Sequence, residues 1–386
     1  MKDLTQGSIV RHILIMAAPI AAGMIFQTLY FLVDLYFVAQ LGDSAIAGVS
    51  AAGNATFVVL ALTQVLGVGS VALISHAVGR KDQPDANLVF NQSIGLSALA
   101  GLVVLIGLFT LTHGYMESVS ADEATIRSGE LYLYWYAPGL ALQFALVAMG
   151  SALRGTGIVQ PTIAVQIISV LINAILAPVL IAGWGTGYPM GVAGAGLASS
   201  IALAAGVLLL WGYFKRLEHY VSFNRAQWRP QLAQWKRILN IGLPAGGEFA
   251  LMFIYFGVIY WTIRDFGAEA QAGFGIGSRI MQSIFLPAMA IAFAAGPVAG
   301  QNFGARNAAR VTDTFMKTAL LSTVLMTAIT LLAQWQPEFF VGIFTTEAEV
   351  IAVGALFLQL ISLNFIAQGL IFTCSSMFQG LGNTRP

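Results

Sequence analysis

Charged side chains are scarce in this chain. Its 386 residues include 18 Lys and Arg and 17 Asp and Glu, which together make up 9% of the sequence. Soluble domains carry about 25% charged residues, whereas hydrophobic residues reach 58% here. The composition therefore indicates a polytopic membrane protein and excludes soluble enzymes and secreted disulfide scaffolds. The net charge of +1 excludes a strongly basic surface, so no nucleic-acid partner is expected.

Other absences narrow the function. The single cysteine, Cys374, cannot form an intramolecular disulfide and is too few for a metal site. The sequence contains no Walker lysine motif, so neither ATP drive nor an ATPase subunit is expected. It also lacks any pattern of nucleophile and base. We therefore expect no enzyme activity, no catalytic residues and no resident cofactor.

Long apolar runs dominate what is present. A membrane-spanning helix needs about 20 mostly apolar residues, and their continuity excludes the alternating strands of a β-barrel. The sequence predicts ten spanning helices, over residues 13–39, 46–76, 88–112, 130–150, 161–183, 191–214, 238–263, 270–300, 311–335 and 351–376.

The basic residues predict the orientation of these helices. The N-terminus and the even-numbered connections hold fourteen Lys and Arg, whereas the odd-numbered connections hold only Arg127 and Arg264. Because cytoplasmic loops are enriched in Lys and Arg, the N-terminus is expected in the cytoplasm. In the basic stretch 215–237, Trp228 and Trp235 either rest at the lipid headgroups or belong to a solvated linker.

The chain contains an internal repeat. Identical residues recur at a constant offset of 225 without a gap, as in the pairs Pro19 and Pro244, Gly79 and Gly304, and Gln143 and Gln368. The repeat predicts an all-α membrane protein of two lobes: residues 1–225, with six helices and the basic cytoplasmic linker, and residues 226–386. Because six helices is an even number, both copies insert in the same sense. Such parallel repeats are typical of transporters with a cavity between two lobes.

The second copy stops before the first one does. Pro386 matches Pro161, just ahead of the fifth predicted helix. We therefore expect a truncated C-terminal lobe of four helices, 6 + 4 in this sequence where a complete chain would hold 6 + 6.

Polar side chains at membrane depth mark a first candidate site, since a charged group there costs roughly 2.5–3.5 kcal/mol. Asp34 shares one helical face with Tyr30 and Gln27. The fourth helix has a similar stripe in Tyr132, Tyr136 and Gln143, and the fifth one in Gln166, Ser169 and Asn173. We expect these stripes to form a polar pocket inside the first lobe, where Asp34 either exchanges a proton or binds Na⁺. Alternatively, Asp34 only fixes helix packing.

The second lobe offers weaker candidates. Glu248 follows Pro244 by four residues, and Arg279 lies deep in the eighth helix. Arg279 either pairs with Glu248 or binds an anionic group of a substrate. Asn364, Gln368 and Ser375 form a polar face of the tenth helix, which suits either a substrate cavity or ordinary hydrogen bonding between helices.

Five segments then carry a family resemblance. The segments 33–42, 154–161, 191–199, 275–280 and 296–305 resemble the MATE transporters, which extrude multidrug and toxic compounds, and the likeness spans essentially the whole chain. It implies two six-helix lobes and export of diverse, often cationic small molecules in exchange for H⁺ or Na⁺. It also implies a multi-pass protein of the bacterial plasma (inner) membrane, which we expect to be a monomer.

The resemblance assigns roles residue by residue. Asp34 matches the family's acid in the first helix, and Gln27 and Tyr30 match its neighbours. Asn173 matches the amide of the fifth helix, and Ser199 the hydroxyl of the sixth. The sequence departs from some members at Ala177, where they carry a second acid, and in the tenth helix, which has Asn364 but no Asp. Asp34, Asn173 and Ser199 are thus the predicted cation-coupling residues.

Three other functions fit the sequence less well. A flippase for lipid-linked or polysaccharide precursors, the runner-up, would favour a strongly cationic cavity, and Arg279 is the one deep basic residue within the predicted spans. A passive channel lacks a recognisable selectivity filter, and a membrane enzyme lacks a catalytic group. An ion-coupled efflux transporter is therefore the predicted function, and the sequence leaves the choice between H⁺ and Na⁺ open.

Overall fold

The structure, a computed structural model, describes residues 1–119, 122–218, 220–263 and 268–384. Arg264 and Pro386, used above, lie outside them. In the first half of the chain, the helices are α1 (Ile9–Ala39), α2 (Asp43–Gly79), α3 (Gln83–Val119), α4 (Glu123–Gly155), α5 (Gln160–Ile181) and α6 (Val192–Arg216). A short 3-10 helix, η1 (Arg225–Gln227), precedes α7 (Leu232–Ile263), α8 (Ala268–Gly304), α9 (Ala308–Trp335), α10 (Pro337–Gly342), α11 (Ala348–Ser362) and α12 (Phe365–Leu381).

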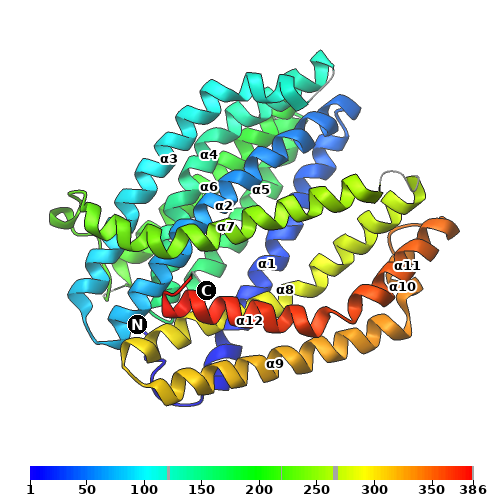
Figure 1. The fold of residues 1–386 in the computed structure, drawn as a ribbon. Helices are drawn as coiled ribbons and strands as arrows, with labels where there is room; N and C mark the ends of the chain where they lie inside the picture. The colour runs from blue at the N-terminus through cyan, green and yellow to red at the C-terminus, as the bar shows by residue number, and fades with distance from the viewer. Residues whose placement is uncertain (120–121, 219, 264–267, 385–386) are drawn as a thin grey trace.

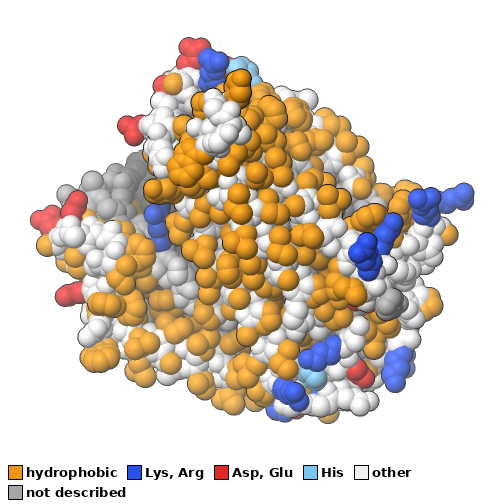
Figure 2. Space-filling view, turned by 180° about the vertical axis from the view of Figure 1, so that it is seen from behind, with side chains coloured by type: hydrophobic (Ala, Val, Ile, Leu, Met, Phe, Trp, Pro, Cys, Tyr) orange, Lys and Arg blue, Asp and Glu red, His pale blue; other side chains and the backbone are white. Residues whose placement is uncertain are grey.

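The all-α, polytopic membrane architecture is confirmed. Each of the ten predicted ranges falls on a helix or a helix pair. Among the described residues, eight helices are long and apolar enough to cross a membrane, and α11 with α12 would make a ninth. Figure 2 shows a broad apolar surface, with most Lys and Arg side chains along its right and lower edges and most Asp and Glu at the upper and left edges.

The range 351–376 is not one continuous helix, as the sequence predicted. α11 ends at Ser362, and α12 begins at Phe365 at an angle of 55°. Two side chains of α9 take up carbonyls freed by the break. Thr330 Oγ1 donates to the carbonyl of Ser362 (3.0 Å), and Gln334 Nε2 donates to that of Gln359 (2.6 Å). Donors from another helix thus support a break that no local signal marks.

The helices form two bundles that meet at the end carrying both termini and diverge toward the other end (Figure 1). One core joins α2, α3, α4 and α6, and further cores join α8 to α9, α11 and α12. α1 and α7 each cross between the bundles. Ile13 and Ile20 of α1 belong to a separate core with residues of α8, whereas Ile238 and Ile241 of α7 pack in the core of the first bundle.

The contacts within the two bundles repeat at the offset seen in the sequence. A Cβ on Gly48 would lie 2.7 Å from Gly129 N, and a Cβ on Gly273 would lie 3.2 Å from Gly354 N. Both members of the second pair lie 225 residues after those of the first. Glycine lets each pair of helices approach closely. These contacts agree with two copies of one helical unit, and the boundary at residue 225 stays a prediction.

The basic linker is not freely solvated. Asn91 of α3 accepts hydrogen bonds from Asn224 N (2.9 Å) and Trp228 Nε1 (3.1 Å). Its neighbour Gln92 donates to the carbonyl of Gln227 (2.6 Å). Asn91 and Gln92 are buried, so they hold the linker against the first bundle.

The N-terminal segment ties the bundles together where they meet. Lys2 N donates to the carbonyl of Thr156, just after α4 (2.8 Å), and Leu4 N donates to Gln301 Oε1 of α8 (2.9 Å). The other end of this amide, Gln301 Nε2, donates to the carbonyl of Gly155 (3.0 Å). One buried glutamine therefore links the segment to both bundles.

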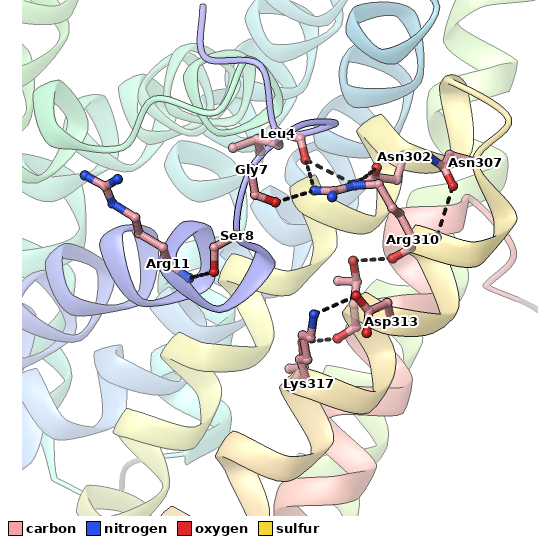
Figure 3. A network of polar contacts seen from close by, with 11 residues as sticks. Leu4, Gly7, Ser8, Arg11, Asn302, Asn307, Arg310, Asp313 and Lys317 are labelled. Carbon is pink, nitrogen blue, oxygen red and sulfur yellow. Dashed lines mark hydrogen bonds and ion pairs between the residues drawn. The ribbon is translucent and has the colours of Figure 1, made fainter.

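Residues 2–7 form the strap that joins the bundles, and an arginine of α9 also holds it in place (Figure 3). Arg310 donates to the carbonyl of Gly7 (3.1 Å) and to Asn302 Oδ1 (3.0 Å), while Asn302 Nδ2 donates to the carbonyl of Leu4 (3.2 Å). Loop carbonyls that would otherwise lack partners are thus satisfied by α8 and α9. The strap (residues 2–7) fixes this end of the molecule closed.

Candidate functional site

Asp34 lies buried in the first bundle, with 5% of its surface exposed. Tyr132 Oη of α4 donates to Asp34 Oδ2 at 3.4 Å. The other oxygen, Asp34 Oδ1, is buried and has no hydrogen-bond partner among the described residues. Buried carboxylate oxygens are rarely left unpaired, so Oδ1 is free to bind a proton or a cation.

Asn173 of α5 lies in the same pocket. Its Nδ2 donates to Tyr30 Oη (3.4 Å) and to Ser199 Oγ of α6 (3.3 Å). Tyr30 also hydrogen-bonds with Tyr136 of α4. Asn173 Oδ1 is a second buried oxygen without a partner among these contacts. The structure thus brings together five of the predicted residues on four helices, along with Asp34.

Helical spacing explains why these side chains meet. Tyr132 and Tyr136 are four residues apart on α4, so their rings share one face, with centroids 5.4 Å apart. Small residues allow α6 to approach that face. A Cβ on Gly196 would lie 2.5 Å from the carbonyl of Tyr132. This close approach brings Ser199 within reach of the pocket.

Three predicted residues contribute less. Gln27 and Gln143 are half-buried and make no side-chain hydrogen bond among the described residues. Ser169 is buried on α5, and its hydroxyl also has no partner there. Ser169 Oγ is therefore a further free oxygen in the first bundle.

A second polar group lies around Glu248 of α7, whose side chain is exposed. Ser375 Oγ of α12 donates to Glu248 Oε2 (2.8 Å), and Gln379 Nε2 approaches the same oxygen at 3.4 Å. The pairing of Arg279 with Glu248 is not formed. Arg279 is exposed, and its carbonyl accepts a hydrogen bond from Ser283 Oγ (3.0 Å).

Asn364 and Gln368 do not join this group in the structure. Asn364 is exposed at the break before α12, where its carbonyl accepts from Gln368 N (2.9 Å). Gln368 is half-buried one turn later. The break therefore places Asn364 at a helix start rather than in the middle of a continuous polar face.

Two adjoining hollows lie next to Glu248, and together we name them the central cleft. The first opens between α2 and α4 of one bundle and α8 and α12 of the other. The second is bounded by α7, α8 and α12 and contains Glu248, Met289 and Phe372. Both hollows share Phe293, Ser376 and Gln379. The lining is apolar with a few polar groups, as in small-molecule sites, but the hollows hold about 50 and 70 Å³, against roughly 300–1,000 Å³ for such a site. The bundles must therefore part further for a substrate to bind.

The first hollow also contains Arg154, which no sequence pattern marks as a site residue. Arg154 and Gln379 both line this hollow and lie 225 residues apart (379 − 154). The repeat relates other lining residues in the same way, such as Val68 and Phe293. A comparison of the two copies at these positions would have identified residues that line the cleft.

Comparisons with known proteins agree with this architecture. The sequence model of the MatE family matches residues 19–179 and 244–386. The chain is 27% identical to the probable multidrug resistance protein YpnP of Bacillus subtilis (strain 168), covering 98% of this chain and 86% of that one. It is 26% identical to the multidrug export protein MepA of Staphylococcus haemolyticus (strain JCSC1435), covering 98% and 83%.

The fold is also similar to solved structures. A multidrug resistance MATE family transporter in an outward-facing conformation superimposes with a TM-score of 0.92 at 23% identity, covering 100% of this chain and 86% of that chain. A MATE structure in the straight conformation gives a TM-score of 0.91 at 23% identity, covering 99% and 85%.

Proposed function

This chain belongs to the MATE family of membrane transporters, and from that premise we propose that it exports small, often cationic organic compounds in exchange for H⁺ or Na⁺. The observation that carries the proposal is the buried carboxylate of Asp34, whose Oδ1 is unpaired among the described residues. The names of the relatives YpnP and MepA, a multidrug resistance and a multidrug export protein, support the choice of substrate.

The coupling ion binds at Asp34. A proton would neutralise the carboxylate, and Na⁺ would need further oxygen ligands, which hard cations prefer. Asn173 Oδ1, which is unpaired among the described residues, and the hydroxyl of Ser199 offer oxygens on α5 and α6 next to Asp34. Both ions therefore suit the same three residues, and no other cofactor is needed.

Substrate binds in the central cleft, with Glu248 as the carboxylate that attracts a cationic group. Ser375 and Gln379 position this carboxylate, while Phe293 and Phe372 supply aromatic surface. The other residues that the sequence predicts for the substrate cavity line neither hollow and stay predictions: Gln27, Tyr30, Tyr132, Tyr136, Gln143, Arg279, Asn364 and Gln368. A cation next to aromatic rings gains roughly 0.5–2 kcal/mol beyond its charge pairing.

The transport cycle needs two orientations of the bundles. The cleft is closed where the strap and Gln301 link α4 to α8. Ion binding at Asp34 favours one orientation and substrate binding the other, because a ligand shifts an equilibrium only through its different affinity for the two states. The strap must release for the cleft to open at the end with the termini.

We also propose an orientation and a location for the protein in the cell. The N-terminus lies in the cytoplasm, because Lys and Arg gather in the connections on that side. The protein acts as a monomer in the bacterial plasma (inner) membrane, without an ATPase subunit. A lipid-precursor flippase is less well supported, since the central cleft contains an acid, Glu248, as well as Arg154.

Expression in bacteria that lack their own exporters tests the function. We expect cells that make the protein to accumulate several-fold less ethidium, a monocationic dye, than cells with an empty vector. The measurement is steady-state fluorescence, with the amount of protein in the membrane checked by immunoblotting. Equal accumulation despite normal membrane levels would contradict the proposal.

A further inference from the structure

Arg154 has no carboxylate partner among the residues that the structure describes. It lies in the last turn of α4, and its side chain makes one hydrogen bond to a described residue, from Nη2 to Ser151 Oγ (3.0 Å). Its Nε is buried and has no acceptor among the described residues. The ion pairs found in the described part of the chain do not include Arg154. A guanidinium is always charged and presents five donors, so most of its bonding capacity is unused.

The end of α4 offers only partial compensation. Carbonyl groups at a helix C-terminus favour a nearby cation only weakly at the surface. An ionised group removed from water is strongly disfavoured unless it is paired. Arg154 faces the first hollow of the central cleft, where a bound molecule could supply the missing acceptor.

The two copies of the repeat differ in charge around the cleft. Arg154 in the first copy corresponds to Gln379 in the second, and Glu248 in the second copy corresponds to Gly23 in the first. The first copy therefore adds a positive group to the cleft, and the second copy adds a negative one. Because each copy has a charged residue where the other has an uncharged one, the cleft contains one positive and one negative group.

These two charges do not neutralise one another. Glu248 is held by Ser375 and Gln379, and no ion pair joins it to Arg154. Gln379 lines both hollows and donates to Glu248. Each charge is left available for a ligand group of opposite sign.

We propose that Arg154 is an anion-binding subsite of the central cleft, so that the transporter prefers aromatic compounds that carry a carboxylate as well as a cationic group. The carboxylate of the substrate accepts from the guanidinium of Arg154, the aromatic body packs on Phe293, and the cationic group faces Glu248. Arginine suits this role because its planar fork matches a carboxylate. The inference rests on the proposed export function and names its substrate class.

A pair of dyes isolates the anionic group. Rhodamine B carries one delocalised positive charge and a free benzoate, and its methyl ester keeps the cation but loses the anion. Binding of each dye to the purified protein in detergent is measured by fluorescence anisotropy. We expect the wild type to bind the free acid at least about tenfold more tightly than the ester, which corresponds to about 1.4 kcal/mol. In Arg154→Gln this preference should disappear, and Arg154→Lys should retain only part of it.

Arg127→Gln is the matched control, because Arg127 is an exposed arginine near the other end of α4. It should retain the wild-type preference. Equal affinity of the wild type for both dyes would overturn the proposal even if Arg154→Gln failed to fold, and so would an unchanged preference in a folded Arg154→Gln. If neither dye bound to the wild type, the proposed export function itself would be contradicted along with this inference.

Discussion

Replacing Asp34 with asparagine should abolish ion-driven transport while retaining dye binding. Asparagine keeps the size and hydrogen-bonding capacity of the side chain but cannot exchange a proton or supply a negative charge to Na⁺. Coupling energies between two sites are typically about 1–3 kcal/mol, or roughly 5–150-fold in affinity. Asp34→Asn should remove most of that coupling and lower gradient-driven dye uptake by at least about tenfold. Uptake is measured in proteoliposomes, and binding separately in detergent.

Asp43→Asn is the matched control for this change. Asp43 is the first residue of α2 and is exposed, so its substitution should leave uptake within about twofold of the wild type. The same reduction in both variants would point to a general loss of protein. Full gradient-driven uptake by Asp34→Asn would show that Asp34 only fixes helix packing.

A large effect on stability is expected where α2 crosses α8. A Cβ on Gly79 would lie 1.9 Å from the carbonyl oxygen of Gln301, and a Cβ on Gly304 would lie 2.2 Å from that of His76. A single methyl group at either position must push the two helix backbones apart. Because overpacking costs about 1–3 kcal/mol or more, Gly79→Ala and Gly304→Ala should each lower the thermal unfolding temperature in detergent.

Gly53→Ala provides the comparison within α2. A Cβ at that position would meet nothing within 4 Å, and alanine favours a helix over glycine by about 0.8–1.0 kcal/mol. Its unfolding temperature should equal or exceed that of the wild type. If Gly79→Ala were as stable as Gly53→Ala, the close crossing of α2 and α8 would be wrong.

The features predictable from the sequence were those with a local or periodic signal. Long apolar runs give the helix ranges because a spanning helix must satisfy its own backbone in lipid. The stripe of Tyr132 and Tyr136 identifies a helix face, and the structure places that face next to Asp34. The offset of 225 also relates the glycine contacts of the two bundles.

Other features depend on residues far apart in the sequence. The break before α12 is supported by Thr330 and Gln334 of α9, and the linker is held by Asn91, more than 130 residues upstream. The strap depends on Gln301, nearly 300 residues after Leu4. None of these polar residues stands out in its own helix, because its partner is defined only by the packing.

The pairing of Glu248 with Arg279 shows a different reason for error. Both are charged residues at predicted membrane depth, and a mutual ion pair is the simplest way to accommodate them. In the structure, both are exposed, and Glu248 has hydroxyl and amide partners on α12. Opposite charge alone did not identify the partner, since the positions of α7 and α8 decide which side chains meet.

An ion gradient is expected to drive export, and transport in reconstituted vesicles shows whether it does. Purified protein is reconstituted into vesicles with the lumen at higher H⁺ or, separately, higher Na⁺ concentration than the outside, and uptake of rhodamine B methyl ester is followed over time. We expect one of the two gradients to drive the dye above its equilibrium level, and an ionophore for that ion to abolish the accumulation. Equilibration of the dye to the same level under both gradients and in their absence would contradict it.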